Sequence, residues 1–248
     1  MNEPPSNAPA PGPTARGFVT TRWSLVLAAG QPGAPEAHKA LSELCTLYWH
    51  PLYDFVRRQG LPPDKAKDLI QGFLTRVLEK NALAVVEPGR GRFRSWLLAS
   101  VKHYLANEWD RERAEKRGGT RVQVDLEDAE TCFNQVPMPG LTPERAFERR
   151  WALGLLRRVL TALGEEYARE GQALRFEKLQ QTITGEEADS YAHIATELGM
   201  REGAVRKAAF RLRQRYQELL LTELSHTVEK PEDVTDELRF LISAVEDG

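Results

Sequence analysis

Cationic side chains are concentrated in the segment Tyr191–Arg215, which reads YAHIATELGMREGAVRKAAFRLRQR. Ala195 lets two helices approach closely and Gly199 suits a tight turn between them, so we expect a helix-turn-helix. The residues expected to fill the angle between its helices are Ile194, Leu198 and Val205. The second helix carries Arg201, Arg206, Lys207, Arg211 and Arg213. Such side chains contact phosphates and base edges in a DNA major groove; an ordinary helical hairpin with a solvated basic face is the alternative.

Charge is segregated along the sequence, although the formal net charge of the 248 residues is only −2. The net charge is +4 over residues 90–117, −4 over 122–143, +5 over 199–216 and −7 over 217–248. Two basic segments separated by an acidic one indicate two contacts with a single polyanion. Solvated charged faces are the alternative explanation.

Other function classes find little support in the sequence. No apolar run reaches the ~18–20 residues that span a bilayer, and the Pro- and Ala-rich start lacks the apolar centre of a signal peptide. Cys45 and Cys132 lie far apart and the five histidines are scattered, so no metal-binding spacing is present. We therefore expect a cytoplasmic protein that is not an enzyme and has no catalytic residue, metal or cofactor.

Apolar residues recur at three- and four-residue spacings, which predicts an all-α fold. The expected helices cover about 21–29, 41–59 with Pro51 as a kink, 63–80, 93–117, 143–163, 176–184, the helix-turn-helix, and a last amphipathic helix with Leu238, Leu241 and Val245. Thr142 is a suitable N-cap for the helix that begins at Pro143.

These elements predict two helical domains joined by a flexible linker. The expected divisions are a disordered tail 1–18, a helical domain 19–118, an acidic linker 119–141, a helix-turn-helix domain 142–222 and an acidic C-terminal extension 223–248.

Three stretches, in this order and spacing, carry a resemblance to a known family. They are DKAKDLIQGFLTRVLEK (Asp64–Lys80), GRGRFRSWLLASVKHYLANEWDRERAEKRGG (Gly89–Gly119) and SYAHIATELGMREGAVRKAAFRLRQRY (Ser190–Tyr216). From about Trp23 to Leu221 the chain resembles the extracytoplasmic-function (ECF) sigma factors of bacterial RNA polymerase, within the sigma-70 family. The resemblance implies a region 2-like first domain, which docks on the polymerase and opens the −10 element, and a region 4-like second domain, which reads the −35 element.

The resemblance also implies which residues dock on the polymerase clamp. They are Asp68, Leu69, Gln71, Gly72, Phe73 and Arg76. A mixture of apolar and polar side chains suits a protein interface. Leu69 and Phe73 are equally well explained as core residues.

The positions implied for the single-stranded −10 element follow a glycine-rich loop into the next helix. They are Arg90, Arg92, Arg94, Trp96, Lys102, His103, Asn107, Trp109 and Arg111. Arginines would neutralise phosphates and aromatic rings would stack on unpaired bases. Phe93 and Tyr104 lie on the apolar stripe and are better explained by packing, Trp96 suits either role, and Trp109 is the best exposed aromatic candidate.

The positions implied for the −35 major groove are Arg201, Glu202, Ala204, Arg206, Lys207 and Arg211. Arg213 and Arg215 are assigned to backbone contacts or to solvent. The sequence departs from the family at His103, Asn107 and Lys207-Ala208, so the base preferences of better-known members do not carry over.

We therefore expect a sigma factor whose partners are core RNA polymerase, at its clamp and flap, and promoter DNA. An anti-sigma factor is a further candidate partner, and the free chain is expected to be a monomer without membrane contact. The alternative is a stand-alone helix-turn-helix regulator that never binds polymerase and forms a dimer on palindromic sites. The acidic extension either shields the basic domain until polymerase binds or is a helix that only packs.

Overall fold

The computed structural model describes residues 23–31, 35–80, 82–86, 91–114, 133–134, 140–184, 190–228 and 230–246. Across these ranges every regular element is a helix and no strand occurs, which confirms the all-α prediction. The predicted N-terminal tail and almost all of the acidic linker lie outside the described residues. The predicted domain boundaries therefore stay a prediction.

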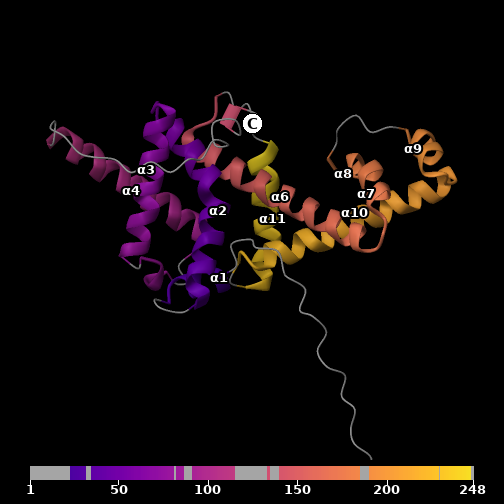
Figure 1. Cartoon of the computed structure of the whole chain (residues 1–248), viewed down its shortest axis with the longest axis horizontal. Helices are drawn as coiled ribbons and strands as arrows, with labels where there is room; N and C mark the ends of the chain where they lie inside the picture. The colour runs from indigo at the N-terminus through magenta and orange to yellow at the C-terminus, as the bar shows by residue number, and fades with distance from the viewer. Residues whose placement is uncertain are drawn as a thin grey trace, which may run out of the picture.

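The molecule is elongated (Figure 1). The N-terminal half contains α1 (Trp23–Ala29), α2 (Pro35–Arg57), α3 (Pro63–Glu79), the 3-10 helix η1 (Ala82–Val85) and α4 (Phe93–Ala114). The C-terminal half contains α6 (Pro143–Arg169), α7 (Ala173–Leu179), α8 (Gln181–Thr184), α9 (Tyr191–Leu198), α10 (Glu202–Ser225), the 3-10 helix η3 (Pro231–Asp233) and α11 (Val234–Glu246). Helices α7, α8 and α9 lie at one end of the molecule, while α10 runs back toward the other helices and α11 lies beside α6.

The predicted helix starts have the expected local causes. Pro63 and Asp64 occupy the first turn of α3, where a missing N–H costs nothing and an acid faces the positive helix end. The Thr142 hydroxyl accepts a hydrogen bond from the Arg145 N–H at 3.3 Å and caps α6. Helix α2 continues through Pro51, and α6 runs to Arg169, beyond the predicted end of its apolar stripe.

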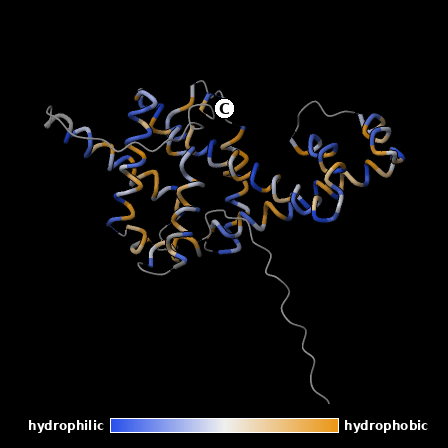
Figure 2. The backbone as a smooth tube through the Cα atoms, in the orientation of Figure 1, coloured by the Kyte–Doolittle hydropathy of each residue, from blue (hydrophilic) through white to orange (hydrophobic). Residues whose placement is uncertain are grey.

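A large apolar cluster joins both halves of the sequence. It includes residues from α1 to α4 and the first part of α6, where Phe147, Trp151, Leu155 and Val159 are buried at steps of four. Leu224 of α10 and Leu241 of α11 also enter this cluster. Figure 2 shows the corresponding apolar residues gathered inside the bundle formed by these helices. The last helix, predicted from its apolar spacing, is thus confirmed and packed.

A smaller apolar cluster lies at the other end of the molecule. It is made of Leu163, Leu179, Ile194, Ala195, Val205, Ala209 and Leu212, with Leu198 packed against it. The sequence analysis named Ile194, Leu198 and Val205 for this position, and all three lie there. Helices α6 and α10 run from the large cluster to this small lobe (Figure 1).

An ion pair within the large cluster fixes α6 against α2. The Arg150 Nε donates to the Asp54 carboxylate at 2.6 Å, and both side chains are buried. Removing one partner of such a pair leaves an uncompensated buried charge, which is far more costly than losing an exposed pair.

Gly72 has a packing reason that the sequence did not reveal. A Cβ atom built at Gly72 would lie 2.4 Å from the Tyr104 hydroxyl oxygen and 3.5 Å from its Cζ. A side chain at this position would therefore displace the Tyr104 hydroxyl of α4.

We predict that Gly72→Ala lowers the free energy of unfolding in the wild-type chain but not in a Tyr104→Phe background. Without the hydroxyl, the alanine gains up to about 1 kcal/mol of helix propensity over glycine. Denaturant titration of the four chains of this cycle measures the effect. Equal effects of Gly72→Ala in both backgrounds would show that the hydroxyl does not limit the approach.

Candidate nucleic-acid interface

The helix-turn-helix has a well-defined turn. The Ser190 hydroxyl accepts from the His193 N–H at 3.2 Å and caps α9. Gly199 ends α9 in the left-handed conformation, with φ of 61°. Because L side chains rarely adopt such a φ, the glycine determines where α9 stops. Arg201 then precedes α10 in an extended conformation.

The second helix of this motif presents its basic face to solvent. The six positions assigned to the −35 groove are all exposed: Arg201, Glu202, Ala204, Arg206, Lys207 and Arg211. The guanidinium of Arg206 bonds to Glu202 at 2.6 Å and lies over the Tyr191 ring, 5.1 Å from its centroid. An exposed pair one helical turn apart contributes little, so a phosphate or base can replace Glu202 at small cost.

Phe210 belongs to this exposed face and was missed from the sequence. Its side chain is 58 % exposed, next to Arg211 and one turn from Arg206 and Lys207. A phenylalanine in a major groove contacts the methyl group of thymine. The helical spacing of the sequence could have identified it, because the buried stripe of α10 runs through Val205, Ala209 and Leu212 and leaves Phe210 outside.

Arg215 links two helices and does not belong to the basic face of α10 described above. Its Nε and Nη2 donate to the Glu166 carboxylate at 2.9 and 2.8 Å, which ties α10 to α6. The hydrogen bonds that Arg215 donates to Glu166 lower the pKa of that carboxyl group. The bonds that Arg215 donates to Glu166 and Glu218 raise its own pKa. Arg213 donates to the Tyr191 hydroxyl at 3.4 Å.

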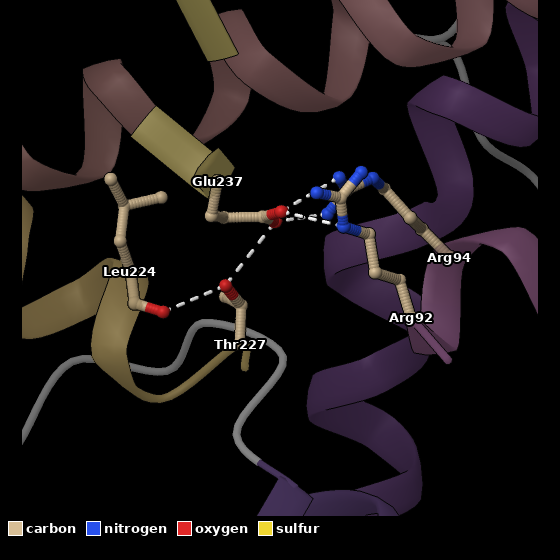
Figure 3. Close-up of polar contacts among 5 residues, drawn as sticks. All are labelled: Arg92, Arg94, Leu224, Thr227 and Glu237. Carbon is tan, nitrogen blue, oxygen red and sulfur yellow. Dashed lines mark hydrogen bonds and ion pairs between the residues drawn. The ribbon is translucent and has the colours of Figure 1, made fainter. Parts of the chain in front are cut away.

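The two described arginines at the start of α4 are already engaged within the chain (Figure 3). Arg94 is only 4 % exposed, and both Arg92 and Arg94 bond to the Glu237 carboxylate of α11. In this conformation Arg94 cannot reach a DNA phosphate. Arg90, the third arginine named from the sequence, lies outside the described residues.

Further along α4, the side chains named for the −10 strand are more accessible. Those exposed to solvent are Lys102, His103, Asn107 and Arg111. The Lys102 ammonium bonds to Glu144 of α6 at 2.7 Å, and this hydrogen bond lowers the pKa of Glu144. Arg111 lies 3.5 Å from Glu108 on the same helix.

The aromatic residues of this segment divide by burial. Trp96 is half-buried and stacks on the buried Phe93 with ring centroids 5.5 Å apart. Trp109 is also half-buried and packs against the large cluster. Tyr104 packs on Phe73, with 5.7 Å between their ring centroids. Phe93 and Tyr104 thus have the packing role that the apolar stripe favours.

The positions named for polymerase docking lie along α3. Leu69 and Phe73 are 7 % and 2 % exposed and belong to the large cluster, in agreement with the core alternative. Asp68 and Gln71 are partly exposed and Arg76 is exposed, with its guanidinium 6.0 Å from the centroid of the Tyr104 ring. The polar members are therefore the ones that a partner can reach.

The described ranges contain neither a cluster of metal-ligating side chains nor a membrane-spanning helix. No group of three or more His, Cys, Asp or Glu side chains there is placed to hold a metal ion. No helix in those ranges has the length and apolar content needed to cross a membrane. Comparison of the chain with protein-family models, with curated proteins and with solved structures gives no match.

The Glu166–Arg215 pair gives a prediction for acid unfolding. Because the folded chain lowers the Glu166 pKa below its usual 4.5, the pair stabilises the fold above that pH. This contribution is lost as the pH falls through the lower folded pKa. Glu166→Gln should therefore flatten the dependence of unfolding free energy on pH below about 4.5, whereas Glu165→Gln, an exposed neighbour, should leave it unchanged. Identical acid limbs for Glu166→Gln and wild type would contradict the assignment.

Proposed function

We propose that this chain is an ECF-type sigma factor, which binds core RNA polymerase and directs promoter-specific initiation of transcription. The observation that carries the proposal is the exposed basic face of α10, presented by a helix-turn-helix whose first helix ends at a left-handed glycine. Helices α6 and α10 connect this face to α4, which lies within the other basic segment, residues 90–117, at the opposite end of the molecule. Two separated basic segments suit a promoter with two separate elements.

In this proposal α10 enters the major groove of the −35 element. Arg206, Lys207 and Arg211 donate to base edges or phosphates, and Phe210 adds an apolar contact. A bidentate arginine on guanine discriminates by about 1–3 kcal/mol against another base pair.

In the same proposal, α4 contacts the −10 element. Lys102, His103 and Asn107 form its accessible polar face, and Trp109 offers a ring for an unpaired base. Stacking of this kind contributes about 1–3 kcal/mol per base. Arg90, Arg92 and Arg94 would neutralise the phosphates of the same strand.

Polymerase docking is assigned to the polar side of α3. Asp68, Gln71 and Arg76 would contact the clamp, while Leu69 and Phe73 hold α3 in place from beneath. The helix-turn-helix region would contact the flap. The polymerase supplies the chemistry, so the proposal needs no catalytic residue and no cofactor, and the free chain would be a cytoplasmic monomer with two helical domains.

Reconstitution with core RNA polymerase tests this function. The wild-type chain should direct transcription from discrete start sites on genomic DNA. Arg206→Ala should reduce these transcripts by about 5- to 150-fold, because it removes a contact of roughly 1–3 kcal/mol. Arg157→Ala, which removes an exposed arginine from α6, is the matched control and should leave them unchanged.

The absence of any promoter-specific transcript would refute the sigma assignment. A dimer that binds palindromic half-sites about 34 Å apart, without polymerase, would instead establish a stand-alone regulator.

A further inference from the structure

The carboxylate of Glu237, on α11, is completely buried and surrounded by donors (Figure 3). Both Nη atoms of Arg94 donate to it, the Nη2 bond being 3.0 Å. The Nε of Arg92 lies 2.8 Å from it. The Thr227 hydroxyl oxygen is 3.3 Å away, but its single hydrogen is shared with the Leu224 carbonyl oxygen, which is nearer at 2.8 Å. A carboxylate in this position is stable because two arginines replace the water it has lost.

A second residue of α11 covers the same two arginines. The Phe240 ring lies 4.3 Å from the Arg94 guanidinium carbon and 5.0 Å from that of Arg92. Trp151 of α6 lies on Arg94 as well, 4.2 Å from its ring centroid to the guanidinium. Two aromatic rings, whose centroids are 6.3 Å apart and whose planes are tilted by 54°, thus lie against the Arg94 guanidinium, and its Nη atoms bond to Glu237.

The Glu237 carboxylate occupies these guanidinium groups as a phosphate would. Arginine binds carboxylates and phosphates alike through paired N–H donors, so one anion excludes the other. The basic positions of α10, by contrast, are exposed to solvent. Among the described residues, α11 therefore engages Arg92 and Arg94 of the first basic segment and leaves the basic face of α10 open.

We infer that α11 is an autoinhibitory lid: its Glu237 and Phe240 compete with single-stranded nucleic acid for Arg92 and Arg94. The inference rests on the proposed function, because it assumes that these arginines bind a DNA backbone. Strand binding requires α11 to leave its place on α4 and α6.

Helix α11 is suited to leave as a unit. It has 13 residues, and isolated helices shorter than about 12–15 residues are marginal in water. Its buried residues are Glu237 and Leu241, while Ile242 on another face is 44 % exposed. Leu241 also lies in the large cluster, and Leu238 and Val245 pack against it. Loss of the Glu237 or Phe240 contacts should therefore raise the fraction of chains in which α11 is released, without unfolding the rest of the bundle.

Two single substitutions in the full-length chain, each with a matched control on the same helix, test the lid. Phe240→Ala removes the aromatic cover and is compared with Ile242→Ala; Glu237→Gln removes the buried charge and is compared with Asp236→Asn. The probe is a fluorescent oligo-dT single strand, titrated at several salt concentrations without polymerase. Hydrogen exchange of α11 and circular dichroism report release of the lid and retention of the fold.

Phe240→Ala and Glu237→Gln should bind the oligo-dT more tightly than wild type and than their controls. Each phosphate neutralised on a single strand steepens the slope of log K against log salt by about 0.7, so two freed arginines should steepen it by about 1.4. Adding Arg92→Ala and Arg94→Ala should abolish the gain. If Glu237→Gln does not fold, the milder Phe240→Ala still tests the inference.

Three results would overturn the lid. One is faster exchange of α11 with an unchanged affinity and salt slope, and another is a gain that persists without Arg92 and Arg94. The third is an α11 that stays protected in both variants, because these contacts would then not hold it. These results concern oligo-dT binding and exchange in the free chain, whereas the transcription assay with polymerase tests the proposed function. Either claim can therefore be refuted while the other stands.

Discussion

The buried carboxylate of Glu237 determines where α11 packs in this fold. A buried anion persists only while cations compensate it, so the packed position of α11 depends on Arg92 and Arg94. The same requirement decides which surfaces DNA can reach. The basic face of α10 is exposed, whereas Arg94 is buried and Arg92, although partly exposed, is paired with Glu237.

The apolar stripe of α6 lies next to the ion pair between Arg94 and Glu237. Phe147 and Trp151 pack in the large cluster, and Leu163 of the same stripe packs in the small one. Trp151 also covers Arg94, so the helix that carries the small lobe takes part in closing the first basic segment. A rearrangement of α6 on α2 would therefore alter the accessibility of α4, and the Asp54–Arg150 pair opposes it.

Much of the fold follows from local sequence. The spacing of Phe147, Trp151 and Leu155 predicts one face of α6, and Gly199 predicts the end of α9 because only a local φ is required there. The contacts between residues far apart in the sequence could not be predicted in this way. Arg94 and Glu237 are 143 residues apart, and no periodicity records which acid will meet which base. A sequence pattern also cannot separate a docking glycine from a packing one, and Gly72 required the position of Tyr104.

Hydrogen exchange of α11 in the assembled complex is the most direct test of the central claim, that Glu237 and nucleic acid are alternative partners of the same arginines. The exchange of α11 amides is compared between the free chain and its complex with core RNA polymerase on an opened promoter. The account predicts slow exchange in the free chain and fast exchange in the complex. Equal protection of α11 in both states would show that the arginines remain on Glu237 while the strand is bound, which would contradict it.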